Sequence, residues 1–146
     1  MVAEQPANWA RDQGLNVTTN ILTANPDLKA IFAENDEMAF GAAAALKAAG
    51  KQGRILLVGY NGTCIGLQAT INGTFQAEGI LFDALNARVL VQTALAYHQG
   101  KKVPPFVETP ILLLDTAQMK AILNGTRKED VPGLKPRLIQ ANAGKC

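Results

Sequence analysis

The chain of 146 residues is long enough for one domain with a substantial core, and 48% hydrophobic with 18% charged residues is an ordinary globular composition. A formal net charge of +2 is too small to indicate nucleic acid or an anionic membrane as a partner. No apolar run approaches the roughly 18 residues of a membrane span. The opening residues Met1–Pro6 lack the basic and apolar regions of a signal peptide, so we expect no targeting segment in this chain.

The first forty residues predict a strand, a helix and a second strand. Val2–Glu4 is predicted to be the end of a short strand. Asn8 is a good N-cap for a helix over residues 9–23, where apolar residues recur at helical spacing. Leu28–Ala33 is then predicted to be a strand, with Ile31–Ala33 buried.

The middle of the chain predicts the strand on which the fold is centred. Ile55–Gly59 is apolar without alternation, which is typical of a parallel strand buried on both faces. Before it, Asp36 is the expected N-cap of an alanine-rich helix, Glu37–Ala49. After it, Thr63 is the expected cap of a helix that reaches about Thr70.

The remainder predicts a strand at Phe75–Leu81, a helix from Ala84 to about Gln99 capped by Asp83, an extended edge or crossover segment at Phe106–Leu114, a short helix at Thr116–Leu123 and a mostly irregular stretch at Thr126–Cys146. Strands that alternate with helices indicate the α/β class with a mainly parallel sheet, arranged as three layers, αβα.

The residues that catalysis requires are sparse. His98 is the sole histidine and the chain has no serine, so no nucleophile–histidine pair can be placed. Glu34 and Asp36 could form a carboxylate pair, but helix capping and solvation are the favoured explanation. Metal-ligand spacings and phosphate-binding glycine motifs are absent. We therefore predict no enzyme, no metal and no cofactor.

Two cysteines are too few for a disulfide framework or a four-ligand zinc site. Cys64 falls in the first turn of a predicted helix, where the helix dipole could lower the thiol pKa, but a small apolar filler is the favoured interpretation. Cys146 ends the predicted irregular stretch and is expected to be exposed.

Polar and aromatic residues follow successive predicted strands. Trp9, Asn35 and Asn61 each come shortly after a strand, and parallel connectivity brings such positions to one edge of a sheet. Asparagine both donates and accepts hydrogen bonds, and an indole suits the apolar face of a sugar ring. For each residue alone, forming a turn or packing in the core is the favoured interpretation. Together they predict a site for a neutral polar ligand.

Four segments carry a resemblance to the type I periplasmic sugar-binding proteins, and most of all to ribose-binding proteins of ABC transporters: Gln5–Arg11 (QPANWAR), Gly14–Asn16 (GLN), Ala33–Ala39 (AENDEMA) and Val58–Thr63 (VGYNGT). The resemblance is dense to Gly73, still present at Thr93–Val103, and fades beyond Pro110.

This resemblance implies non-catalytic capture of a small neutral sugar, such as ribose, in the periplasm for uptake through an ABC transporter permease. It implies that Trp9 packs on the sugar ring and that Asn35 and Asn61 bind its hydroxyls. The family usually has aspartate at Asn61 and glutamine at Leu81, so two ligand positions depart from the pattern. The alternative is an effector-binding domain of a sugar-responsive transcriptional regulator, which shares the architecture.

The resemblance also implies that residues 1–103 form an α/β half like the family's C-terminal lobe, and that residues 104–146 add a crossover strand, a short helix and an irregular tail. A single, partial lobe leaves half a site, so we expect weak or lost ribose binding. It would also leave the strand Leu28–Ala33 without a neighbour, which predicts a homodimer.

Overall fold

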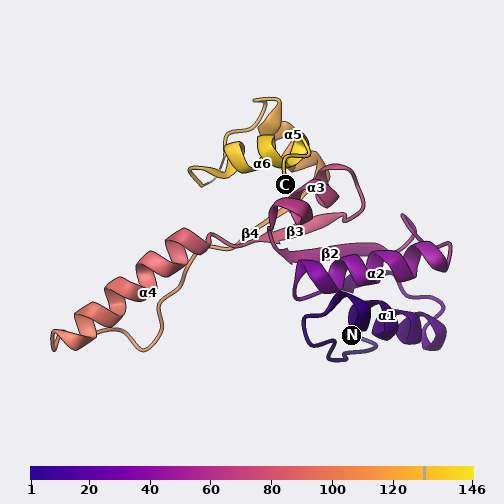
Figure 1. The fold of residues 1–146 in the computed structure, drawn as a ribbon, viewed down its shortest axis with the longest axis horizontal. Helices are drawn as coiled ribbons and strands as arrows, with labels where there is room; N and C mark the ends of the chain where they lie inside the picture. Colours follow the sequence, from indigo (N-terminus) through magenta and orange to yellow (C-terminus); the bar gives the residue numbers. More distant parts are fainter. Residues whose placement is uncertain (130) are drawn as a thin grey trace. The chain divides into compact units, whose positions relative to one another are not determined.

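The structure, a computed structural model, describes residues 1–129 and 131–146 (Figure 1). Its helices are α1 (Arg11–Ala24), α2 (Asp36–Ala48), α3 (Cys64–Ile71), α4 (Asp83–His98), α5 (Thr116–Leu123) and α6 (Leu134–Asn142). Its strands are β1 (Ala30–Phe32), β2 (Leu56–Asn61), β3 (Ala77–Ile80) and β4 (Leu112–Asp115). The chain forms two compact units, residues 1–80 with 113–146, and residues 81–112.

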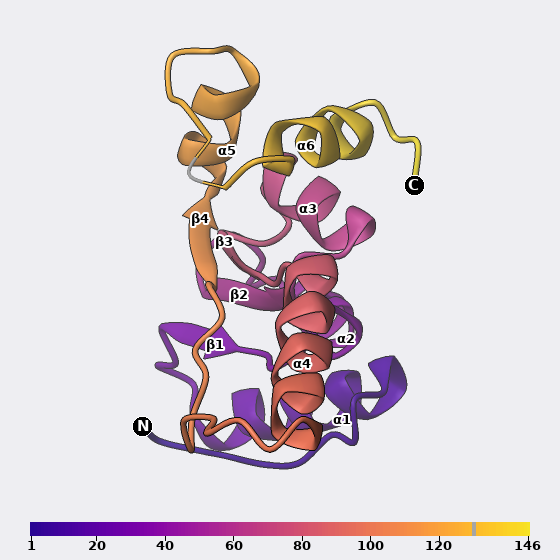
Figure 2. The same ribbon diagram turned by 90° about the vertical axis from the view of Figure 1, so that its left-hand side faces the viewer.

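The strands form one sheet in the order β1-β2-β3-β4, visible in sequence from bottom to top in Figure 2. β1 and β2 are parallel, with Phe32 opposite Val58, and β2 and β3 are parallel, with Gly59 opposite Glu78. The predicted α/β class with a mostly parallel sheet is confirmed. The strand predicted from the apolar run at Ile55–Gly59 is β2, an inner strand as expected, but it is not buried on both faces, because Leu57 is buried whereas Leu56 on the other face is 54% exposed.

Helix α2 begins where the sequence supplies a cap, although the cap is the residue before the predicted one. The Asn35 side chain accepts a hydrogen bond from the Met38 amide, so Asn35 is the N-cap and Asp36 is the first helical residue. The Thr63 side chain caps α3 as predicted, by accepting from the Gly66 amide.

Helices α1 and α2 pack backbone to backbone through two glycines. A Cβ atom on Gly41 would lie 2.1 Å from the Arg11 carbonyl oxygen, and one on Gly14 would lie 2.7 Å from the Met38 carbonyl oxygen. Only hydrogen fits at either position, so these glycines set the distance between the two helices. The buried core lies between this helix pair and the sheet and includes Leu46, Leu57 and Phe75.

Three predictions for the amino-terminal part are wrong. Val2–Glu4 is not a strand, since residues 1–7 have no regular structure. Asn8 does not cap α1, because Asn8 and Trp9 both have positive φ and Ala10 is the residue before the helix. Phe32 is exposed rather than buried, because β1 is an edge strand and Phe32 lies on its uncovered side.

The predicted irregular stretch at the carboxyl end is wrong in part, because it contains helix α6, which packs on α3 and α5. Asp130, within that stretch, lies outside the described residues. The interpretation of Cys64 as a small apolar filler is also wrong, because Cys64 forms a disulfide with Cys146 across a sequence separation of 82; Cys146 is exposed, as expected. Because α6 packs on α3, the carboxyl end of the chain lies beside the first residue of α3. No local sequence pattern indicates this contact.

The second unit consists of α4 and the segment that returns from it. Helix α4 matches the predicted range, but Phe82 is its N-cap and Asp83, the predicted cap, is its first residue. All residues of α4 are described, and none of them is buried. A small cavity of about 450 Å³ lies between α4 and residues 104–109. Across both units, the described residues contain no helix long and apolar enough to cross a membrane.

Candidate functional site

Asn35 and Asn61 lie at the ends of two strands and Trp9 lies two residues before α1; hydrogen bonds link Asn35 to Trp9 and Asn61 to Asp36. Asn35 follows β1 and donates from Nδ2 to the Trp9 carbonyl oxygen at 3.2 Å, while its Oδ1 accepts from the Met38 amide at 2.8 Å. Asn61 ends β2, and its Oδ1 accepts from the Asp36 amide at 3.3 Å. Asn35 therefore contacts Trp9 directly, and the residue after it contacts Asn61.

The backbone at this edge is strained at two of the three predicted positions. Trp9 has φ 55° and Asn61 has φ 130°, values that side chains other than glycine rarely adopt. Such conformations persist where surrounding contacts enforce them, and they are concentrated at functional sites. The Trp9 side chain is 71% exposed, so its indole face is open to a ligand rather than used in the core.

A buried pair of carboxyl groups lies directly beneath this edge. Asp36 and Glu78 are 2% and 0% exposed. Asp36 Oδ2 accepts from both the backbone amide and the hydroxyl of Thr63, and Glu78 Oε1 accepts from the Gly62 amide at 2.8 Å. Burial, reinforced by the hydrogen bond to Asp36 and by its charge, raises the pKa of Glu78 to about 9.

The carboxylate pair considered in the sequence does not form. Glu34 is exposed, whereas Asp36 points into the core toward Glu78. Asp36 is therefore neither the N-cap nor a solvated surface charge. Glu78 itself offered a signal, because a single acid within the apolar strand Ala77–Ile80 requires a buried partner.

An ion pair holds α1 to α2 beside the site. Arg11 Nε donates to Glu37 Oε2 at 2.9 Å, and the same guanidinium lies 4.7 Å from the centre of the Phe40 ring. The two charged side chains are about half exposed, so the pair contributes little to stability. The pair joins the first residue of α1, two residues after Trp9, to α2.

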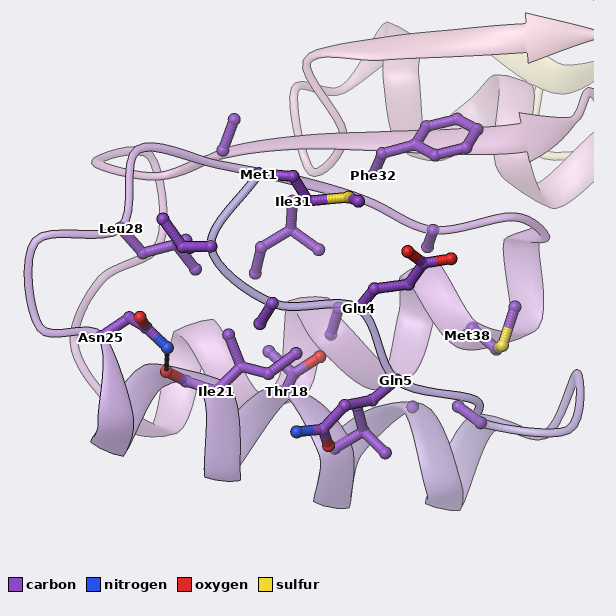
Figure 3. Close-up of a pocket in the computed structure, with 18 of the residues that line it drawn as sticks. Met1, Glu4, Gln5, Thr18, Ile21, Asn25, Leu28, Ile31, Phe32 and Met38 are labelled. Carbon is purple, nitrogen blue, oxygen red and sulfur yellow. Dashed lines mark hydrogen bonds between the residues drawn. The ribbon is translucent and has the colours of Figure 1, made fainter.

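A cavity of about 1150 Å³ lies beside β1 (Figure 3); Trp9 is among its lining residues, whereas Asn35 and Asn61 are not. It is bounded by the amino-terminal segment, by α1 and by the outer edge of β1, and Ile21, Leu28 and Ile31 point into it. Its lining is mainly apolar, which suits packing against protein better than binding a sugar.

The described part of the chain contains no candidate metal site. Residues 1–129 and 131–146 contain no group of three histidine, cysteine, aspartate or glutamate side chains that could hold an ion. The disulfide removes both cysteines as metal ligands or nucleophiles.

Comparison with known families identifies this architecture. Residues 1–102 match the family described as periplasmic binding protein domain. The chain belongs to this family. The ribose import binding protein of Salmonella typhimurium is 49% identical over 104 residues, 70% of this chain and 34% of the relative. The D-allose-binding periplasmic protein of Escherichia coli is 52% identical over 62 residues, 42% of this chain and 20% of the relative.

Solved structures of the family agree. An ABC transporter solute-binding protein from Actinobacillus succinogenes with bound D-allose superposes with a TM-score of 0.72 and 37% identity, covering 82% of this chain and 43% of that one. The chain thus spans about a third of the length of the curated relatives it matches. These relatives are named as binding proteins, in agreement with the prediction that the chain is not an enzyme.

Proposed function

We propose that this periplasmic binding protein domain binds a small neutral monosaccharide without catalysis, through Trp9, Asn35 and Asn61, and that it serves uptake by an ABC transporter permease in the periplasm. The observation that supports the proposal is that Asn35 donates to the Trp9 carbonyl while Asn61 accepts from the amide of Asp36, the next residue after Asn35. The disulfide between Cys64 and Cys146 supports an oxidising compartment such as the periplasm.

The free hydrogen-bonding groups fit a ligand with hydroxyls. Each asparagine amide has two N–H groups, and Asn35 gives one of them to the Trp9 carbonyl. Among the described residues, no protein group accepts from the Asn61 amide nitrogen, because its contact with Asp36 uses the oxygen. Hydroxyl oxygens of a sugar would accept from these donors while the ring packs on the exposed indole.

Calorimetric titration with a panel of pentoses and hexoses tests the site. We expect saturable binding of at least one sugar, lost in Trp9→Ala because the stacking surface is removed. Asn35→Asp is the sharper probe at the second position: aspartate keeps the oxygen that caps α2 but has no amide donor. Binding that survives in both variants would show that the sugar is held elsewhere.

The affinity of this chain for ribose is expected to be low. A carboxylate in place of Asn61 would provide a charge-assisted acceptor, and an amide in place of Leu81 would provide a polar group where the side chain is apolar. We therefore expect Asn61→Asp combined with Leu81→Gln to tighten ribose binding about tenfold or more. Tight ribose binding by the unchanged chain, with no gain in the double variant, would contradict this explanation.

We also propose that the chain forms a symmetric homodimer through the outer edge of β1. The Leu56 amide donates to the Lys29 carbonyl and the Ala33 amide to the Val58 carbonyl, so alternation directs the backbone groups of Ala30 and Phe32 away from β2. Among the described residues no strand pairs with that edge. The apolar cavity beside it adds surface that a second copy would cover (Figure 3).

Light scattering measures this directly. We expect twice the monomer mass of 15.5 kDa for the unchanged chain under non-reducing conditions. Ala30→Pro removes one outward-facing N–H and should shift the chain to monomer, whereas Ala30→Gly keeps the N–H and should leave the dimer intact. A monomeric mass for the unchanged chain would reject the dimer.

A further inference from the structure

Two buried carboxyl groups accept hydrogen bonds from the turn that contains Asn61. Glu78 Oε1 accepts from the Gly62 amide, and Asp36 Oδ2 accepts from the Thr63 amide at 2.9 Å. The amide of Asp36 in turn donates to the Asn61 side chain. The two carboxyl groups thus hold Gly62 and Thr63, and the backbone amide of Asp36 holds the Asn61 side chain.

The surrounding backbone is shaped to admit this pair. A Cβ atom on Gly59 would lie 2.5 Å from Glu78 Oε2, and one on Gly66 would lie 2.3 Å from Asp36 Oδ2. β2 and α3 therefore have glycine at the two positions where any side chain would collide with the carboxyl groups. The carboxyl groups of the two acids occupy the space that these glycines leave, so the backbone is arranged to accommodate both of them.

The two remaining carboxyl oxygens face each other. Asp36 Oδ1 and Glu78 Oε2 are buried and meet no N–H or O–H donor among the described residues. A proton retained by Glu78 satisfies both at once, since the protonated carboxyl donates to the Asp36 carboxylate. Without that proton, two negative charges would face each other in the core.

We propose that Asp36 and Glu78, joined by a carboxyl–carboxylate hydrogen bond, are positioning residues that fix the Asn61–Thr63 turn for ligand binding. This inference rests on the proposed sugar site, because Asn61 is a ligand residue there. Neither acid touches the sugar. Their effect on binding is exerted through the turn.

The pH dependence follows from the groups around Glu78. Asp36 faces it from α2, and Arg137 of α6 lies across the turn, where its guanidinium donates to the Gly62 carbonyl. Helix α3 has no acidic or basic side chain. The pKa of Glu78 in the folded chain, about 9, exceeds its ordinary value of 4.5, so the folded chain holds more protons between these values. Stability therefore falls as pH rises toward 9, and the turn loosens when the proton leaves.

Three variants of the full chain distinguish a role of Glu78 in positioning the turn from a role in packing alone. Glu78→Gln keeps an oxygen for the Gly62 amide and an N–H for Asp36 but does not titrate. Glu78→Leu keeps the bulk and loses both hydrogen bonds. Glu34→Gln is the matched control, because it removes an exposed carboxylate beside Asn35 without touching the turn.

The first readout needs no sugar: amide hydrogen exchange at Gly62 and Thr63 at neutral pH, with the carbon-13 carboxyl resonance of Glu78 followed against pH. We expect a Glu78 midpoint near 9 and unchanged exchange in Glu78→Gln and Glu34→Gln. In Glu78→Leu, exchange at the Gly62 amide should accelerate about tenfold or more, because this amide loses its acceptor, and exchange at Thr63 should rise less, because Asp36 still accepts from it. An ordinary Glu78 midpoint, or unchanged exchange in Glu78→Leu, would overturn the inference whatever the sugar result.

The second readout is sugar affinity against pH. We expect affinity in the unchanged chain to weaken as pH approaches 9, and Glu78→Gln to stay constant over that range. Affinity that falls equally in both would overturn the link to the site. If the turn responds as described and no sugar in the panel binds, the proposed function fails while the assignment of the two acids to the turn is supported.

Discussion

Replacing both cysteines by alanine is expected to lower the free energy of unfolding by about 2–4 kcal/mol. The disulfide joins residues 82 apart in sequence, and closing so long a loop removes much of the freedom of the unfolded chain. It also ties the carboxyl end beyond α6 to the first turn of α3. Chemical denaturation of Cys64→Ala/Cys146→Ala against the oxidised parent gives the difference directly.

Reduction of the parent provides the matched control. A thiol reductant should lower the stability of the parent to that of the double variant and leave the double variant unchanged. The loss should also extend to the ligand edge, because α6 supplies Arg137 to the Gly62 carbonyl and would be less firmly held. Equal stability of oxidised and reduced parent would show that the bond does not form in solution.

Replacing Gly41 by valine is expected to cost about 3 kcal/mol, because the new Cβ would meet backbone rather than a flexible side chain. Its position lies 2.1 Å from the Arg11 carbonyl oxygen and 2.6 Å from the Leu15 amide nitrogen. Helix α1 would have to move away from α2. Since α1 begins two residues after Trp9, the contact between Asn35 and the Trp9 carbonyl would be lost as well.

The comparison is Ala44→Val in the same helix. Ala44 is exposed, so valine there costs only its lower helix propensity, about 0.5 kcal/mol. Thermal unfolding of both variants isolates the steric effect from propensity. If Gly41→Val unfolds at the same temperature as Ala44→Val, then α1 and α2 do not pack as closely as described.

The sequence by itself determined the elements whose signals are local. The uninterrupted apolar run at Ile55–Gly59 predicts the strand β2 correctly, although only one face of that strand is buried. Thr63 caps α3 and the helices at Asp83–His98 and Thr116–Leu123 lie where their periodicity places them. The family followed from short motifs that carry the turns at the ends of β1 and β2.

Only the tertiary structure decided which partners these residues meet. Phe32 was misjudged because the burial of a strand residue depends on what covers that face of the sheet, and Val2–Glu4 was misjudged because the segment pairs with no strand among the described residues. Helix α6 lacks a side-chain cap, contains a proline and depends on packing against α3 and α5, so its sequence alone suggested an irregular stretch. The pairing of Cys64 with Cys146 depends on that same packing.

Asp36 and Glu78 show most clearly the difference between what the sequence indicates and what only the tertiary structure decides. A glutamate within an apolar strand signals a buried partner but cannot name it, because Asp36 lies 42 positions away on another element. The fold brings the start of α2 over β3, and glycines at residues 59 and 66 open the space between them. Local propensity acts over a few residues, whereas a shared proton is decided by which side chains the chain brings together in a dry interior.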